Sequence, residues 1–102
     1  MYRRSDDGSF NSWDVQSVIT VGSSAVATNV TSAKILGIHT VGEIYFNFSS
    51  SSSASVSTAN DLKLAAGLTF INVPKFSGSD VSQYIHTQRV GSSNVSMRLV
   101  HV

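Results

Sequence analysis

Hydrophobic and polar positions alternate along most of the chain from residue 15 onward. The alternation is clearest between residues 43 and 48, where Ile44, Phe46 and Phe48 share one parity and Tyr45 and Asn47 share the other. A period of two residues is typical of a β-strand that packs one face on a core and exposes the other. No stretch shows a convincing period of 3.6 residues, so the pattern predicts an all-β protein.

The turn signals divide this pattern into seven or eight short strands. We predict strands over residues 15–21, 25–30, 33–40, 43–48, 62–64, 68–73, 81–90 and 94–102, with the second on a sheet edge or bulged. In the first predicted strand, Val15 and Val21 share a face. Val41-Gly42 is a hairpin-like break between strands 33–40 and 43–48. Gly91-Ser92-Ser93 joins the last two strands as a pair. Strands spaced by about 8 to 12 residues are typical of a small antiparallel β-sandwich, either jelly-roll or immunoglobulin-like.

Residues 1–14 differ from the rest, because they hold many charged side chains and show no periodicity. We interpret them as an extended N-terminal arm that becomes ordered against another surface, and residues 15–102 as the sandwich domain. The alternative is that Trp13 starts the first strand and caps the core. The candidate partner-binding residues of the arm are Tyr2, Arg3, Arg4, Phe10 and Trp13.

The longest low-complexity segment is the serine run Ser49–Ser53, which continues through Ser55 and Ser57. Serine has almost no apolar surface to bury, so this run predicts an exposed loop that makes no specific contacts and tolerates shortening.

Composition excludes several classes of protein. The net charge is +1, and the seven Lys and Arg residues are scattered, so we expect no nucleic-acid partner. The chain has no cysteine for disulfides, no secretory signal, and no apolar run near the roughly 18 residues that a membrane helix requires. We therefore expect a protein made in the cytoplasm, with no membrane partner and with stability that comes from packing or assembly.

The candidate chemistry is sparse. Three histidines, His39, His86 and His101, fall in predicted strands and could meet around zinc only if those strands were neighbours in matched register. Serine is about a fifth of the chain, so a serine near a histidine is expected by chance, and no Gly-x-Ser-x-Gly elbow occurs. We expect no enzymatic activity, no metal and no cofactor. Another reading is a sugar-binding face built on Tyr45, Tyr84 and Trp13.

From Ser32 onward, the order of features resembles that of small β-sandwich virion proteins of tailed bacteriophages. Residues 33–48 resemble the paired strands that open these domains, and a Ser/Thr/Ala-rich loop follows. Residues 62–74, with Ala66-Gly67 and Val73-Pro74, are similar to a segment that recurs in these proteins, and the chain then closes on a strand. The resemblance spans about seventy residues and is one of composition and order.

The resemblance implies a non-enzymatic structural protein located in the virion and made in the host cytoplasm. Its most specific form is a capsid decoration (cement) protein that binds the major capsid protein lattice, as a homo-oligomer, with a trimer favoured. The alternatives are a head–tail or tail accessory subunit bound to another virion protein, and a carbohydrate-binding or adhesin module. The resemblance transfers no functional residue.

Overall fold

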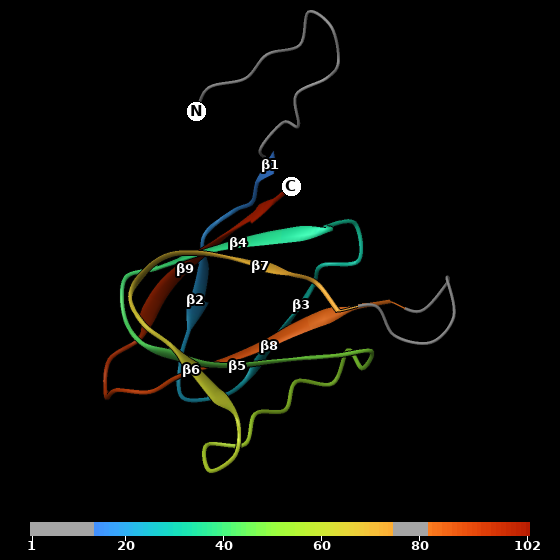
Figure 1. Ribbon diagram of the computed structural model, residues 1–102. Coiled ribbons are helices and arrows are strands. Elements are labelled where there is room, and N and C mark those ends of the chain that lie inside the picture. The colour runs from blue at the N-terminus through green and yellow to red at the C-terminus, as the bar shows by residue number, and fades with distance from the viewer. Residues whose placement is uncertain (1–13, 75–81) are drawn as a thin grey trace, which may run out of the picture.

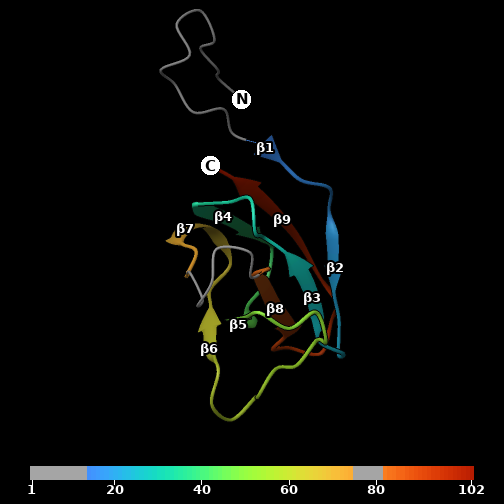
Figure 2. The ribbon, with the colours of Figure 1, turned by 90° about the vertical axis from the view of Figure 1, so that its right-hand side faces the viewer.

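The computed structural model describes residues 14–74 and 82–102 and confirms an all-β sandwich. Two antiparallel sheets pack face to face, and the described residues contain no helix, hence none that could cross a membrane (Figures 1 and 2). Sheet A contains β1 (Asp14–Val15), β2 (Ile19–Val21), β4 (Ile35–Thr40), β7 (Gly67–Asn72) and β9 (Val95–His101). Sheet B contains β3 (Val26–Asn29), β5 (Ile44–Ser49), β6 (Leu62–Leu64) and β8 (Tyr84–Arg89).

The strand order shows that the sandwich is a jelly roll. Sheet A runs β2-β9-β4-β7, and sheet B runs β3-β8-β5-β6. Four nested pairs follow from this order, namely β2 with β9, β3 with β8, β4 with β7, and β5 with β6. The chain from β2 to β9 is therefore one long antiparallel ribbon, folded back on itself between β5 and β6 and rolled into two sheets.

This topology corrects two hairpins predicted from the sequence. The break at Val41-Gly42 does not join a paired hairpin, because β4 lies in sheet A and β5 lies in sheet B. The same holds for Gly91-Ser92-Ser93, which carries the chain from β8 in sheet B to β9 in sheet A. Both connections are short and glycine-containing, as hairpin turns are, and only long-range pairing distinguishes a turn within a sheet from a crossing between sheets.

A bulge divides the first predicted strand into β1 and β2. Val15 pairs with Val100 and Ile19 pairs with Met97, so three residues of one chain segment lie opposite two residues of β9. The extra residue reverses the alternation of side chains. Val21 is consequently buried in the core while Val15 lies on the outer face of sheet A, although the sequence pattern placed them on one face.

Other predicted elements agree with the structure. The short segment 25–30 forms β3, which lies at the edge of sheet B, and Ile44, Phe46 and Phe48 point into the core as their spacing indicated. The segment 65–67 between the predicted strands 62–64 and 68–73 carries the chain from sheet B to sheet A, and Gly67 has a positive φ of 125° that suits glycine. Of the predicted arm, only Asp14 is described. It belongs to β1 and pairs with His101 of β9.

The core lies between the sheets and is almost entirely aliphatic. Ile19, Phe46, Phe48, Leu64 and Ile71 are partly buried against it. The fully packed residues are Val21, Val30, Ala33, Leu36, Ile38, Ile44, Val73, Ile85, Val95, Met97 and Leu99. The central strands β4, β5, β8 and β9 supply most of this set, so these four strands bury most of the hydrophobic surface of the core.

Two isoleucines of β4 provide a matched test of this packing. Ile38 is fully buried between the sheets, whereas Ile35 is 38% exposed on the outer face of sheet A. We expect Ile38→Ala to lower the free energy of unfolding by about 2–5 kcal/mol, because it leaves a cavity. Ile35→Ala should cost about 1 kcal/mol or less. Urea denaturation of both variants measures the difference, and equal losses would contradict the assigned strand faces.

Candidate functional site

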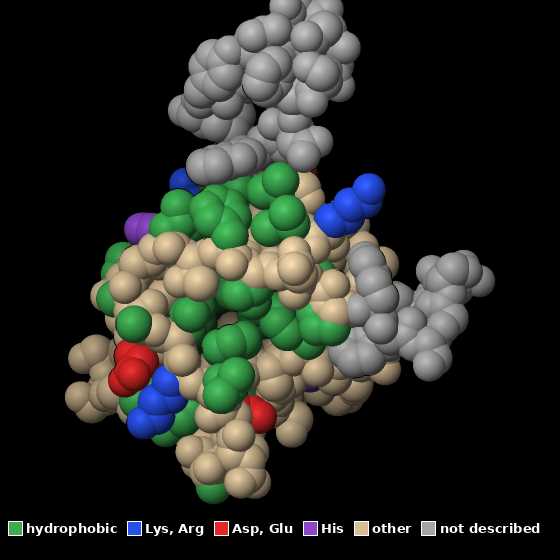
Figure 3. Space-filling view, in the orientation of Figure 1, with side chains coloured by type: hydrophobic (Ala, Val, Ile, Leu, Met, Phe, Trp, Pro, Cys, Tyr) green, Lys and Arg blue, Asp and Glu red, His purple; other side chains and the backbone are tan. Residues whose placement is uncertain are grey.

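The two outer faces of the sandwich differ in chemistry. The outer face of sheet B is polar and is crossed by the chain's own serine-rich connection between β5 and β6, which runs along the lower side in Figure 2. The outer face of sheet A bears exposed hydrophobic side chains. Figure 3 shows hydrophobic side chains gathered around β4 and the end of β9, and a mostly polar surface over the serine-rich connection at the bottom.

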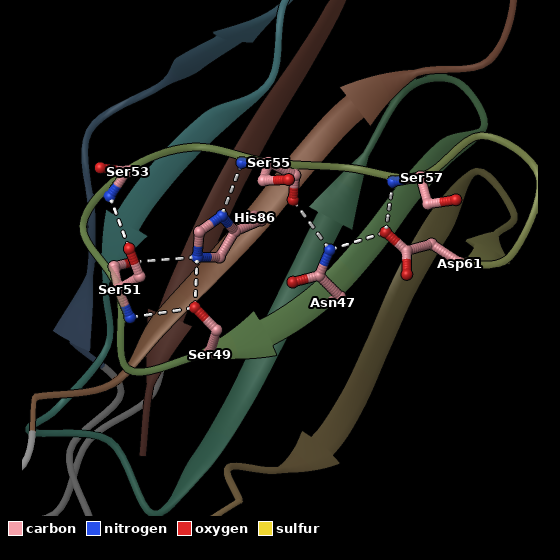
Figure 4. A pocket seen from close by; sticks show the side chains of 8 residues that line it. All are labelled: Asn47, Ser49, Ser51, Ser53, Ser55, Ser57, Asp61 and His86. Carbon is pink, nitrogen blue, oxygen red and sulfur yellow. Dashed lines mark hydrogen bonds between the residues drawn. The ribbon is translucent and has the colours of Figure 1, made fainter.

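Residues 50–57 of this connection form what we call the serine strap. It covers His86, which points outward from the middle of β8 yet is only 1% exposed. Asn47 lies directly opposite His86 on β5 and also points outward. A polar side chain in this position would ordinarily face water, so its burial depends on the strap that folds over it (Figure 4).

His86 holds the strap through both of its ring nitrogens. The backbone N–H of Ser55 donates to Nδ1 at 3.0 Å, and Nε2 lies 3.0 Å from both the Ser51 carbonyl oxygen and the Ser49 hydroxyl. An N–H can only donate and a carbonyl can only accept, so Nδ1 is the acceptor and Nε2 carries the proton. The surroundings therefore fix the neutral Nε2–H tautomer, and the ring connects two backbone groups of the strap.

A second anchor lies farther along the strap, at Asn47 and Asp61. The Asn47 amide donates to the Ser55 carbonyl at 3.0 Å and to the Asp61 carboxylate at 2.6 Å. The same carboxylate oxygen accepts the Ser57 N–H at 2.9 Å. Hydrogen bonds to a charged carboxylate are stronger than neutral ones, so this cluster fixes the far end of the strap.

The serines of the strap have distinct roles. The Ser49 hydroxyl accepts the N–H of Ser51, and the Ser51 hydroxyl accepts the N–H of Ser53, at 3.0 and 3.1 Å. Short side chains that bond to the backbone two residues ahead form local turns without any core. The expectation of an exposed loop is confirmed for residues 50–55 but is wrong for Ser49, which is the last residue of β5 and half-buried. The expectation that the run makes no specific contacts is also wrong.

Strap and sheet together line an open depression of about 410 Å³. Its lining residues are Asn47, Ser49, Ser51, Ser53, Ser55, Ser57, Asp61 and His86. The nitrogens of His86, the amide of Asn47 and one oxygen of Asp61 are already engaged by the strap. The cluster therefore serves to hold the strap in place.

The contact between Ser49 and His86 resembles a nucleophile–base pair only in its distance. A general base must present an unprotonated nitrogen to the hydroxyl that it activates. Here Nε2, the nitrogen beside Ser49, carries the proton, and a backbone N–H rather than a carboxylate faces Nδ1. A second serine–histidine pair joins the Ser32 hydroxyl to Nδ1 of His101 at 3.1 Å. The other ring nitrogen of His101, Nε2, has no hydrogen-bond partner among the described residues. Neither histidine is oriented by a carboxylate.

The three histidines do not converge. His86 belongs to sheet B, whereas His39 and His101 belong to sheet A. The strands β4 and β9 are neighbours, but His39 lies opposite Arg98 and His101 lies opposite Leu36, so the two rings point to opposite faces. Among residues 14–74 and 82–102, no three His, Asp or Glu side chains are grouped so that they could hold a metal ion.

The aromatic residues considered for sugar binding do not form a platform in the described part of the chain. Tyr45 and Tyr84 share the outer face of sheet B, but Tyr45 pairs with Gln88 and Tyr84 pairs with Ser49, in different rows. Both rings are half-buried, and the amine of Lys63 lies 5.6 Å from the centre of the Tyr45 ring. Trp13 lies outside the described residues, as do the other predicted partner-binding residues, Tyr2, Arg3, Arg4 and Phe10.

An apolar row crosses the outer face of sheet A from edge to edge. It runs through Val15 of β1, Val100 of β9, Gly37 of β4 and Phe70 of β7, which lie opposite one another in register. Val15 and Phe70 are 44% and 42% exposed. Leu68 and Ile35 extend the row along the strands, and both are also exposed. We call these residues the sheet A face.

Gly37 leaves space for the Phe70 ring within this face. A Cβ atom at residue 37 would lie 2.8 Å from the Phe70 ring and 3.1 Å from Val100, closer than packed atoms approach. Glycine in a strand interior ordinarily weakens the strand, and its presence here marks a close approach. The absence of a side chain at Gly37 thus leaves room for the Phe70 ring and for Val100 beside it, on the outer face of sheet A.

The first prediction that concerns the site, as distinct from the core, is the tautomer of His86. Long-range ¹H–¹⁵N NMR spectra of labelled protein at neutral pH should show His86 as the Nε2–H tautomer, since Ser55 N–H occupies Nδ1. The exposed His39 gives an internal reference in the same spectrum. A proton found on Nδ1 of His86 at neutral pH would contradict the assigned hydrogen bonds.

The second prediction compares odd and even serines at the junction of β5 and the strap, from Ser49 to Ser52. Ser49→Ala with Ser51→Ala removes two hydroxyls that accept backbone N–H groups, and should lower the unfolding free energy by about 1–2 kcal/mol and speed hydrogen exchange in the strap. Ser50→Ala with Ser52→Ala should change stability by less than about 0.5 kcal/mol. Equal behaviour of the two double variants would mean that the strap is an unspecific linker.

Comparison with known proteins identifies no relative. No family model matches the chain, and neither a curated protein nor a solved structure matches it. What the protein does must therefore follow from the chemistry and placement of its own residues.

Proposed function

We propose that the protein is a non-enzymatic structural subunit of a virion, most specifically a capsid decoration protein that binds the major capsid protein lattice. The resemblance of residues 32–102 to small phage β-sandwich proteins supports the virion, and one structural observation supports the mode of action. That observation is the sheet A face, an apolar row exposed on one side of a sandwich whose other side is covered by its own strap.

An exposed hydrophobic surface is costly in water and is typical of contact with another macromolecule. The sheet A face includes Val15 of β1, and residues 1–13 directly precede β1 in the sequence. Three of the chain's nine Phe, Trp and Tyr residues lie in that arm, and Tyr and Trp are enriched among the residues that anchor interfaces. The protein thus has an apolar surface and, directly before β1 in the sequence, an aromatic-rich segment, which together suit a subunit of a larger assembly.

The chemistry and the fold are consistent with this proposal. His86, the histidine most engaged with serines, holds the strap and is in the wrong tautomer to act as a base for Ser49. Jelly rolls are common in viral capsid proteins and also in lectins, so the architecture supports the proposal by analogy only. A near-neutral chain with scattered charges also suits dense packing of many copies, since like charges would repel.

The third prediction tests attachment through the arm. In the particle that carries this chain, deletion of residues 1–12 should abolish stable attachment, because each buried aromatic side chain contributes about 1.5–3 kcal/mol. The isolated truncated domain should keep the melting temperature of the parent. Particle pull-down and calorimetry measure the two effects.

The copy number in the same particle discriminates among virion roles. Hundreds of copies indicate decoration of the capsid lattice, whereas about a dozen indicate a head–tail or tail accessory subunit. A truncated domain that still attaches to the particle would refute the role of the arm. Loss of monomer melting temperature would instead show that residues 1–12 pack on their own core, which is the alternative to an arm that binds a partner.

A further inference from the structure

We propose that His86 is a pH-sensitive switch, whose neutral ring holds residues 50–55 of the serine strap on sheet B and whose protonated ring releases them. The inference concerns the strap alone and does not depend on the virion proposal. It rests on the hydrogen bond that Nδ1 accepts, on the burial of the ring, and on the charged groups around it.

The switch acts at Nδ1, because this nitrogen must stay unprotonated while the strap is closed. It accepts the backbone N–H of Ser55 at 3.0 Å. An imidazolium carries a proton on both ring nitrogens and accepts no hydrogen bond. A second proton would therefore point at the Ser55 N–H, so that two donors face each other and the bond is lost. The bond from Nε2 to the Ser51 carbonyl already uses a proton there and does not change.

The closed strap offers the charged ring nothing that compensates for its burial. His86 is only 1% exposed, so water does not solvate it. Asp61 lines the same depression, but its carboxylate accepts the Asn47 amide and the Ser57 N–H. Among the described residues, no carboxylate bonds to the ring. Burial of a charge without a paired counter-ion is costly, so the closed state disfavours the imidazolium.

The strands beside His86 supply no second counter-ion. The residues opposite it are Ala27 on β3 and Asn47 on β5, both uncharged. Lys63 lies over the Tyr45 ring in the next outward-facing row and adds a positive charge. Glu43 lies beyond that row, beside Val90. The described titratable side chains on this side of the sheet, apart from His86, are Tyr84, Tyr45, Lys63, Glu43 and Asp61.

Acid therefore favours release of the strap. The closed strap requires a neutral ring, whereas an opened strap exposes the ring to water, where an imidazole becomes charged at about pH 6.5. The hydrogen bond from Ser55 thus stabilises the closed strap fully above that pH. Its contribution declines as the pH falls below it, because the opened state binds the additional proton.

The strap can detach without unfolding of the sandwich. Residues 50–55 are exposed and contribute no side chain to the core. Detachment also breaks the bond from the Asn47 amide to the Ser55 carbonyl, which is a single neutral hydrogen bond. The bond from Ser57 to Asp61 involves no histidine and can persist. Release therefore uncovers the outward side chains of Asn47 and His86 on the two central strands of sheet B (Figure 4).

Hydrogen exchange of the full-length chain, followed by NMR between pH 7.5 and 5, tests the switch. After correction for the intrinsic effect of pH on exchange, the protection factor of the Ser55 amide should fall by about tenfold or more, because the opened state gains a proton. The Ser57 amide, which binds Asp61, and the amides of β4 in the other sheet should keep their protection.

Two matched variants separate His86 from the other histidines. In His86→Gln, the side-chain oxygen can accept the Ser55 N–H but takes up no proton in this pH range, so the protection factor of Ser55 should stay constant. His39→Gln, at an exposed histidine of sheet A, should keep the full response. A tenfold response that persists in His86→Gln would overturn the switch, as would its loss in His39→Gln.

The parent protein alone also decides the question if the His86 variant fails to fold. Protection of Ser55 that is equal at pH 7.5 and pH 5 would overturn the proposal. Loss of protection throughout β4 at the same pH would overturn it too, since the whole sandwich would then unfold. In ¹H–¹⁵N spectra, protonation of Nδ1 of His86 should have the same midpoint as the loss of Ser55 protection, and two separate midpoints would contradict the switch.

Discussion

The nested pairing of the two halves of the chain is the constraint on which the rest of the structure depends. Each strand from β2 to β5 pairs with one from β6 to β9, so the partners lie closest in sequence at the β5–β6 connection and farthest apart at β2 and β9. Rolling this ribbon places consecutive strands in alternate sheets, except β5 and β6, which stay together in sheet B. The turning point of the ribbon is the serine strap, which explains why so polar a segment requires its own anchors.

The strap shows how a segment without hydrophobic side chains can be fixed in place. Serine hydroxyls satisfy N–H groups within the strap, while His86 and the Asn47–Asp61 pair bind its backbone from the sheet. A buried imidazole is stable only when its nitrogens are paired, and here both are. The strap and the histidine therefore depend on each other. The strap thereby covers His86 and Asn47 on the outer side of sheet B.

Sheet A has no comparable cover among the described residues, and this asymmetry directs the functional interpretation. Its central strands present Gly37, His39 and Val100 outward, and the Phe70 ring of the edge strand lies next to Gly37. The bulge between β1 and β2 places Val15 on the same side, at the opposite edge. An apolar row that spans the sheet from edge to edge is a feature of the assembled structure, since its members come from four separate strands.

The sequence by itself determined the all-β class, most strand positions and the core face of β5, because period-two alternation is a local property of each strand. It also indicated that residues 50–57 form a loop, since serines cannot build a core. Tertiary structure alone decided the jelly-roll order, the two crossings mistaken for hairpins and the bulge that separates the faces of Val15 and Val21, because these depend on which distant strands pair. The role of His86 was likewise hidden in the sequence. Its partners lie 31 to 37 residues away, and only the fold brings the strap back over the strand that carries it.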